Sequence, residues 1–198
     1  MIEFNNLSKD IPYLVFKEKY DNSIKADQKN VEAICIASYS SNQKEVNARF
    51  VNLKFINDKE FIFFSNYRSP KSKDFISHNQ ITALIYWSSI NVQIRMKAKI
   101  KTTSREFNQA YFSQRDINKN ALAISSDQSA QISSYDDVNK NYEKSQKKDD
   151  LKKCPEYWGG YSFVPYYFEF WEGHESRLNK REVYEIKNND WTHGYIQP

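Results

Sequence analysis

The sequence predicts an antiparallel β-barrel with helices packed at its ends, a fold of the mainly-β or α+β class. Most of the chain divides into short β-branched and aromatic runs separated by Asn, Asp, Ser and Lys, which is typical of strands. Successive runs are mostly a hairpin's length apart, which favours antiparallel pairing over the longer crossovers of parallel sheets. Helical patterns are confined to the start of the chain and to two interruptions of the strand series.

The first helix is expected in an N-terminal helical segment, residues 1–25. Apolar residues from Leu7 to Tyr20 repeat with a period near 3.6, and Ser8 can cap that helix. Its expected buried face consists of Ile11, Leu14, Val15 and Phe16. Strand-like runs follow at 31–40, 45–56, 60–66, 81–88 and 91–102.

A short helix interrupts these strands after residue 69. Ser69 can cap it, Pro70 suits its first position, and Phe75 and Ile76 supply an apolar stripe. A longer helical excursion covers 103–148, where SREFNQAYFSQR and YDDVNKNYEKSQKK flank a stretch of low hydrophobicity. The strands resume at 159–174, 181–187 and 191–198, with Asn188-Asn189-Asp190 joining the last two.

Length and composition indicate one domain, residues 1–198. Rings supply most of the large apolar surface, with 14 Tyr, 13 Phe and 4 Trp, which excludes a disordered chain. The formal net charge of +4 favours anionic partners, yet both signs alternate along the chain, so nucleic acid is not indicated. No apolar run has the length of a signal or a membrane span, and we expect a cytoplasmic protein without a membrane partner.

The usual catalytic groupings are poorly represented. The three histidines share no ligand spacing, and the chain has no GxSxG motif and no P-loop. Each histidine is expected to face solvent or to cap a helix or turn. Cys35 and Cys154 are far apart in the sequence and are expected to be reduced thiols. Metal and acyl-transfer chemistry are therefore disfavoured.

Cations on strands and at a helix start are the remaining candidates for chemistry. Arg49 and Lys54 are five residues apart, so on a regular strand they point to opposite faces unless a bulge intervenes. Ser65 ends a strand just before a helix start that carries Lys71 and Lys73. Free backbone N–H groups and the helix dipole make such a start suitable for a phosphate. The alternatives are exposed charges on the barrel and a solvated first helical turn.

Two further pairings could recognise a ligand. Tyr111 and Arg115 are four residues apart on an expected helix and share a face, where a phenol and a guanidinium could bind a second phosphate. Near the C-terminus, Trp171, Arg177 and Arg181 fall in a strand, a loop and a strand, which suits stacking and charge recognition. An aromatic core strand with exposed arginines would give the same pattern.

Seven segments, taken in order, carry a resemblance that extends from about Val31 to Pro198. They are RFVNLK (49–54), FFSNYRSPK (63–71), NVQIR (91–95), AYFSQR (110–115), SSDQSAQISS (125–134), WGGYSFVPYYFEFWEG (158–173) and RLNKR (177–181). Together they resemble the pyridoxamine 5′-phosphate oxidase family, the FMN enzymes of vitamin B6 metabolism. The resemblance implies an FMN-binding split barrel that forms a homodimer, with FMN sites at the subunit interface.

The resemblance also implies roles for particular residues. From one subunit, FMN would contact Arg49, Phe50, Val51, Lys54, Phe64, Ser65 and Lys71. Partly from the other subunit, the site would be completed by Gln93, Gln128, Ser129, Trp171 and Arg181. The substrate phosphate would be bound by Lys54, Tyr111, Arg115 and Lys119, the last of which replaces a serine of the family.

The segment RLNKR is where the implied catalytic residue lies and where the chain departs from the family. Arg177 would lie against the substrate ring and help steer hydride transfer to the flavin. Asn179 and Lys180 replace the histidine and aspartate of the familiar RLHDR. Asn179 can hydrogen-bond the substrate ring's oxygen but carries no proton near neutral pH. Elsewhere, Pro70 stands where an arginine commonly assists FMN phosphate binding, which removes a charged contact and a backbone N–H.

The activity implied by the resemblance is an FMN-dependent oxidation. Pyridoxamine 5′-phosphate or pyridoxine 5′-phosphate would become pyridoxal 5′-phosphate, with oxygen as electron acceptor and hydrogen peroxide as a product. No side chain has to be a strong base, which fits the absence of a catalytic histidine or carboxylate pair. Two alternatives are a related oxidase of the phenazine-biosynthesis type and a flavin-binding barrel without turnover. Lys54, Tyr111 and Arg115 favour a phosphate-bearing substrate.

Overall fold

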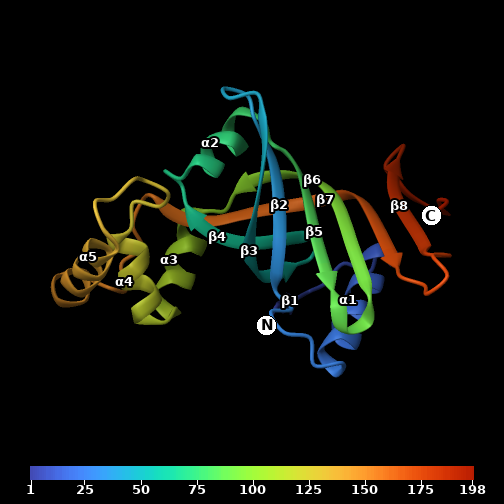
Figure 1. Cartoon of the computed structure of the whole chain (residues 1–198), viewed down its shortest axis with the longest axis horizontal. Helices are drawn as coiled ribbons and strands as arrows, with labels where there is room; N and C mark the ends of the chain where they lie inside the picture. The colour runs from blue at the N-terminus through green and yellow to red at the C-terminus, as the bar shows by residue number, and fades with distance from the viewer.

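Six strands close into a barrel in the computed structural model, which describes residues 1–198 (Figure 1). They are β2 (Ala33–Ser40), β3 (Glu45–Asn57), β4 (Glu60–Asn66), β5 (Gln80–Trp87), β6 (Val92–Thr102) and β7 (Trp158–Glu172). Every pairing among them is antiparallel. Because β4 pairs with both β3 and β7, it closes the order β3-β2-β5-β6-β7 into a ring. The hairpin-length spacing of the strands in the sequence is the reason this antiparallel arrangement forms.

The barrel is split, because β7 is longer than its neighbour β4 and leaves the ring. Its first half pairs with β4, and its second half pairs with β8 (Lys180–Lys187), which continues into β9 (Asp190–Tyr195). A short strand, β1 (Glu3–Asn5), runs parallel to the end of β3. The predicted fold class is confirmed. β1 was not predicted from the sequence, since three residues are too few to show a strand period.

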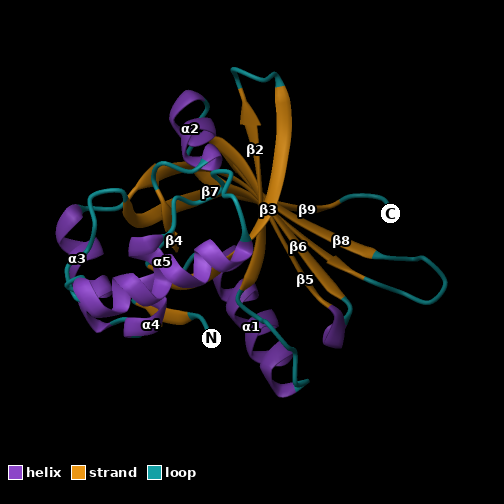
Figure 2. Cartoon of the chain, turned by 60° about the vertical axis from the view of Figure 1, so that its left-hand side comes forward, coloured by secondary structure: helices purple, strands orange, loops and turns teal.

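Helices cover the ends of the barrel. α3 (Arg105–Gln114), α4 (Ile117–Ser125) and α5 (Tyr135–Lys148) lie between β6 and β7 in sequence, within the expected helical excursion. Figure 2 shows these three helices gathered on one side of the strands. A short 3-10 turn, Ser88–Ile90, joins β5 and β6. None of the helices combines the length and the apolar character that a membrane span requires.

The N-terminal helix, α1 (Ile11–Lys25), begins four residues later than expected. Pro12 lies in its first turn, where a missing N–H costs nothing, so the helix starts there and not after Ser8. The expected buried face is wrong for two of its four residues, since Ile11 is 61% exposed and Leu14 50% exposed, whereas Phe16 is buried and Val15 is partly buried against the core. The buried ring residues are Tyr13, Phe16 and Tyr20. Rings at this spacing share one face of a helix and bury more apolar area than the aliphatic residues do.

The second helix, α2 (Pro70–Ser77), starts as predicted, with Ser69 before it and Pro70 in its first position. The Ser69 hydroxyl does not cap the helix, because it donates at 2.7 Å to the carbonyl oxygen of Asn66. Phe75 is buried, whereas Ile76 is 81% exposed, so only half of the expected apolar stripe faces the barrel. This helix therefore rests on the barrel through Phe75, and its first turn points at the end of β4.

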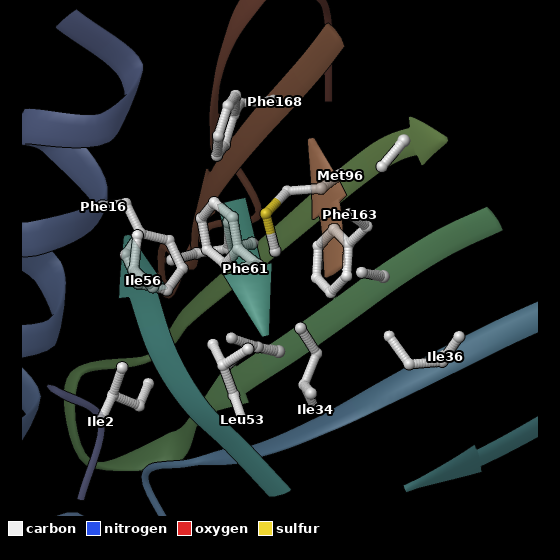
Figure 3. Close-up of a cluster of buried hydrophobic side chains, with 14 of the residues drawn as sticks. Ile2, Phe16, Ile34, Ile36, Leu53, Ile56, Phe61, Met96, Phe163 and Phe168 are labelled. Carbon is white, nitrogen blue, oxygen red and sulfur yellow. The ribbon is translucent and has the colours of Figure 1, made fainter. Parts of the chain in front are cut away.

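Tight turns join the strands where Asn and Asp were expected to permit them. Asp58 has φ 50°, and Asn188 and Asn189 have φ 52° and 70°, values that these short polar side chains tolerate. The rings of α1 pack against the core of the barrel: the ring centroids of Phe16 and Phe61 are 5.1 Å apart (Figure 3). Phe61 in turn stacks on Phe163 of β7 at 5.2 Å. Aromatic packing thus ties the first helix to both halves of the barrel.

Candidate functional site

A cavity of about 520 Å³ opens between β3, β4, the first turn of α2, the last turn of α3 and the loop after α4. Four cations line it, Arg49, Lys54, Lys71 and Arg115, and no acidic side chain does. Cavities of this size are typical of small-molecule sites, and walls of one sign concentrate ligands of the opposite sign. The lining of the cavity therefore suits an anionic ligand.

A β-bulge brings the first two cations to one cavity. The pairing of β3 with β4 shifts register between Leu53 and Phe55, so Lys54 is an extra residue in β3. The bulge changes which face the following side chains take, as the odd spacing of Arg49 and Lys54 requires. Both side chains consequently line the same cavity. A regular strand would have turned Lys54 to the opposite face from Arg49.

Lys71, at the start of α2, is the most buried of these cations, with 8% of its surface exposed. Its Nζ donates at 3.0 Å to the hydroxyls of Ser65 and Ser69, and it forms no ion pair with a carboxylate. Burial and the nearby charge of Arg49 lower the pKa of Lys71 to about 8. A buried ammonium with only hydroxyl partners is electrostatically unfavourable, which a bound anion would relieve. Lys73, by contrast, is exposed to solvent.

Arg49 is held in place by contacts with β2 and α2. It donates at 3.1 Å to the carbonyl oxygen of Ile36 and at 2.7 Å to the hydroxyl of Ser38. The buried carboxylate of Asp74 lies 3.6 Å from its Nη2 and also accepts from Ser38 at 3.0 Å. Burial lowers the pKa of Arg49, and Asp74 opposes that shift. The guanidinium is thereby fixed at the edge of the cavity beside Lys71.

Tyr111 lies in the last turn of α3 and Arg115 is the residue that ends this helix; both line the cavity, so they lie on one side of it, as predicted. Tyr111 stacks on Phe64 with ring centroids 4.0 Å apart, and Phe64 stacks on Trp158 at 5.1 Å. The Arg115 guanidinium lies 5.2 Å from the centre of the Trp158 ring and donates at 3.0 Å to the side-chain oxygen of Asn120. Burial lowers the pKa of Arg115, which has no carboxylate partner. One wall of the cavity is thus an aromatic stack that carries an unpaired guanidinium.

The loop after α4 forms another wall through Gln128 and Ser129. The Gln128 side-chain oxygen accepts from the Ser65 hydroxyl at 3.2 Å and from the backbone N–H of Asn66 at 3.3 Å. Ser129 has φ 72°, a left-handed conformation that is unfavourable for a residue with a side chain. The loop is therefore pinned to the end of β4, and its strain lies at the cavity wall.

The cavity accounts for most of the residues predicted for FMN and for the substrate phosphate. The predicted residues that line it are Arg49, Phe50, Val51, Lys54, Phe64, Ser65, Lys71, Tyr111, Arg115, Gln128 and Ser129. Lys119 lies elsewhere, in an adjoining cavity of about 260 Å³ that also contacts Arg115 and Trp158. Trp158 was not among the predicted site residues, although the glycines that follow it mark a place where chain segments approach closely.

Three predicted residues form a second group, away from this cavity. Gln93, Trp171 and Arg181 are cross-strand neighbours in one row over β6, β7 and β8. None of them lines the cavity. Figure 1 shows why: β8 lies at the opposite end of the molecule from α3, α4 and α5. Within one chain, the structure brings these three residues to each other but not to the cationic cavity.

Arg177 and Asn179 lie in the loop between β7 and β8, also outside the cavity. Arg177 is exposed and has φ 60°, a strained conformation for an arginine. Asn179 has a role that the sequence did not indicate: its side-chain oxygen accepts at 3.0 Å from the backbone N–H of His174. The backbone N–H of Arg177 also donates to the carbonyl oxygen of His174, at 2.9 Å. Asn179 thereby closes the loop that presents Arg177.

The fold and the cavity together define the class of protein, a split barrel with a cavity lined by cations. A family model described as the pyridoxine 5′-phosphate oxidase C-terminal dimerisation region matches residues 158–198. The chain is 33% identical over 189 residues to the pyridoxine/pyridoxamine 5′-phosphate oxidase of Cytophaga hutchinsonii, covering 92% of this chain and 87% of that protein. It is 32% identical over 182 residues to the enzyme of that name from Coxiella burnetii, covering 91% and 92%. The chain belongs to the pyridoxine/pyridoxamine 5′-phosphate oxidase family.

Solved structures share the fold. PhzG from Burkholderia lata 383, crystallised with tetrahydrophenazine-1-carboxylic acid, aligns with a TM-score of 0.88 at 22% identity, over 94% of this chain and 92% of that one. A pyridoxamine 5′-phosphate oxidase-related, FMN-binding protein from Nostoc punctiforme aligns with a TM-score of 0.79 at 13% identity, over 96% and 99%. The resemblance of the seven sequence segments to this family is confirmed.

Proposed function

We propose that this chain is an FMN-dependent oxidase that converts pyridoxamine 5′-phosphate or pyridoxine 5′-phosphate to pyridoxal 5′-phosphate, with oxygen as electron acceptor and hydrogen peroxide as a product. The observation that carries the proposal is the cavity itself. It holds Lys71 of α2 beside Arg49 of β3, and Tyr111 and Arg115 at the end of α3, with no acidic side chain in its lining. Two phosphate-bearing molecules, FMN and substrate, need two such cationic groups in one site.

The residues at the start of α2 fit the phosphate of FMN. Lys71 is buried without a counter-charge, and Arg49 is fixed beside it, so an anion there would be paired with both. Pro70 offers neither a charge nor a backbone N–H, which leaves the phosphate contact to Lys71, Arg49 and Ser65. The remaining cavity residues, Phe50, Val51, Phe64, Gln128 and Ser129, would contact the rest of the cofactor.

When bound, FMN supplies the acceptor that takes a hydride from the substrate and passes its electrons to oxygen. The protein's own task is to orient the substrate and to balance its charge. Lys54, Tyr111 and Arg115 would bind the substrate phosphate, with Lys119 in the adjoining cavity as a further cation within the same region. Arg177 would lie against the substrate ring, held out by the strained loop that Asn179 closes. No side chain is required to act as a strong base.

The second group of residues supports a homodimer with composite sites. Gln93, Trp171 and Arg181 are placed in one row, yet they cannot reach the cavity of their own chain. The same strands, β7 and β8, lie in residues 158–198, which match a dimerisation region of the family. We infer that the row completes the FMN site of the partner subunit. Each subunit would then contribute a cationic cavity to one site and this row to the other.

A second candidate is an oxidase of the same fold that acts on another substrate, as in phenazine biosynthesis. The observation that favours it is Asn179, whose side-chain oxygen is already used within its own loop. Its amide N–H groups can donate to a substrate, but the side chain cannot take up a proton near neutral pH as a histidine can. The first candidate is favoured by Lys54, Tyr111 and Arg115, because a substrate without a phosphate would not require these phosphate-binding groups.

Steady-state assays of the purified, FMN-loaded protein separate these functions. Pyridoxamine 5′-phosphate and pyridoxine 5′-phosphate are supplied in turn, and pyridoxal 5′-phosphate and hydrogen peroxide are measured together. We expect both products in equal amounts. Tight, yellow flavin binding without turnover of either substrate would contradict the B6 reaction and leave a different substrate or a flavin-binding role.

Arg115 tests the assignment of the substrate phosphate. Arg115→Ala should raise the KM for the phosphorylated substrate about ten- to hundredfold, the effect of losing one charge-assisted contact, with the FMN content unchanged. Arg68→Ala is the matched control, because Arg68 stacks on Tyr157 at 4.5 Å and lies outside the cavity. An Arg115→Ala protein that emerges without flavin would show that this arginine binds FMN instead.

A further inference from the structure

Glu169, on β7, is a buried carboxylate that the proposed chemistry does not use. It is 2% exposed and lies among the core residues Phe168 and Phe170 in sequence, but it is paired across the sheet with Arg95 of β6. One of the residues predicted to contact FMN, Arg181 of β8, lies diagonally across the sheet from Glu169. Buried carboxylates are rare unless they are paired, so its partners indicate its use.

Two arginines bind the two oxygens of Glu169 separately. Arg181 donates to Oε1 from Nε at 2.9 Å and from Nη2 at 2.7 Å. Arg95 donates to Oε2 from Nε at 3.0 Å and also from Nη2, and the Tyr167 hydroxyl donates to the same oxygen at 3.1 Å. Burial alone would raise the pKa of Glu169, but these hydrogen bonds outweigh it and hold the pKa below its usual range. The carboxylate therefore stays charged and bridges β6 to β8.

The contacts of Arg181 define what it can still bind. A guanidinium has five N–H donors in a planar fork. Two of them are used by Glu169, and one donates from Nη1 to the carbonyl oxygen of Gln197 at 2.9 Å. One N–H on Nη1 and one on Nη2 remain, in the row that holds Trp171 and Gln93. Their direction is set by Glu169, because a planar group held along one edge has its other edge fixed.

We propose that Glu169 is a positioning residue for cofactor binding: it orients Arg181 so that the two remaining N–H groups face an electronegative edge of the FMN held by the partner subunit. The inference rests on the proposed function, which places this row at that FMN. Stability alone does not account for the arrangement, since replacing a buried ion pair by apolar residues is often neutral or stabilising. A charged bridge fixed by five hydrogen bonds is instead what a preoriented binding group requires.

Glu169→Gln is the first test, because it keeps the side-chain volume and removes the charge. FMN affinity is measured by quenching of flavin fluorescence on titration into the ligand-free protein. We expect the Kd for FMN to rise about ten- to hundredfold, the effect of misdirecting one charge-assisted contact. Glu182→Gln is the matched control, a carboxylate on β8 that pairs with Lys180 and His193 and should leave the Kd unchanged.

A double-mutant cycle distinguishes positioning from general loss of structure. If Glu169 acts through Arg181, Glu169→Gln should have little further effect on the Kd in an Arg181→Lys background. Additive losses in the two variants would overturn the inference. Should Glu169→Gln fail to fold, Glu169→Asp keeps the charge but withdraws the carboxylate from Arg181, and is expected to weaken FMN binding. An unchanged Kd in that variant would likewise overturn the proposal.

The wild-type titration separates the two hypotheses. A wild-type protein that does not bind FMN would contradict the proposed function and, with it, this role of Glu169. A wild type that binds FMN tightly, together with a folded Glu169→Gln protein that binds it equally well, would overturn the positioning role and leave the proposed function intact.

Discussion

Lys71 is the residue at which folding and ligand binding oppose each other most directly. Burial and the charge of Arg49 lower the pKa of Lys71 from 10.5 to about 8 in the folded chain. Between those two values the unfolded chain binds more protons than the folded one, so this residue makes folding more favourable as the pH rises through that window. Below pH 8 the charged amine disfavours the ligand-free fold and favours a bound anion. Such opposition is expected of a binding residue and not of a structural one.

Lys71 also makes FMN binding depend on pH. An anion raises the pKa of a neighbouring amine, so FMN should bind best below pH 8, where Lys71 is charged, and progressively less tightly as the pH rises above about 8. Lys71→Met should weaken FMN binding below pH 8 and abolish this dependence. Lys73→Met, on the exposed side of the same helix, is the control and should retain it. Affinity measured by fluorescence titration from pH 6.5 to about 9.5 covers the window. An identical pH profile in Lys71→Met and wild type would contradict the assignment.

At the scale of elements, β7 connects the two parts of the candidate site. Its first half pairs with β4 and touches α3, while its second half carries Glu169 and Trp171. The join to α3 is close: the N–H of Gly160 donates at 2.8 Å to the side chain of Asn108, and its carbonyl oxygen accepts from Tyr67 and Thr103. The aromatic wall of the cavity therefore depends on how tightly β7 and α3 pack.

Gly160 tests this packing. A Cβ at Gly160 would lie 2.5 Å from the Thr103 hydroxyl oxygen and 3.2 Å from the Phe64 ring. Gly160→Ala should therefore cost about 1–3 kcal/mol in the free energy of unfolding. It should also weaken substrate binding, because Phe64 is displaced. Gly194→Ala is the control, since nothing lies within 4 Å of the added methyl group there. Equal midpoints of urea unfolding for the two variants would show that β7 and its neighbours accommodate the added methyl group without a loss of stability.

At the scale of the whole molecule, the residues predicted for the site form two groups that do not meet within one chain. The cationic cavity lies beside α3, and the row of Gln93, Trp171 and Arg181 lies on the strands that run to the opposite end (Figure 1). A two-fold symmetric dimer is the simplest assembly that joins them, because it places the same two surfaces together twice. Each FMN would then depend on both subunits.

Complementation between subunits tests this assembly. Lys71→Met and Arg181→Ala should each weaken FMN binding when they are the only protein present. Co-expressed in equal amounts, they should form heterodimers with one intact site each, and random pairing should restore about one quarter of the wild-type FMN capacity. Each variant purified alone is the control. If co-expression restores no binding, both residues would have to act on one site within the same subunit.

Local patterns in the sequence were sufficient to predict most of the helices and strands. The run at 60–66 coincides with β4, and Ser69 and Pro70 mark the start of α2, because strand alternation and helix-start residues act within a few positions of the chain. The helical spacing of Tyr111 and Arg115 likewise placed both on one wall. Ser65 and Lys71 were indicated by their place at a helix start, and Arg49 and Lys54 as cations on a strand. The other predicted residues of the cavity, Phe50, Val51, Phe64, Gln128 and Ser129, came from the family resemblance alone.

Only the tertiary structure determined the features that depend on contacts between segments far apart in the sequence. Arg49 and Lys54 share a cavity because β4 accommodates an extra residue in β3, a register choice that no local pattern specifies. The buried face of α1, the place of Lys119 outside the main cavity and the bridge from Glu169 to Arg181 are also set by contacts between segments far apart in the sequence. The sequence by itself therefore determined the strands, the turns and the kinds of charge available. Packing and strand register determined which of those charges meet.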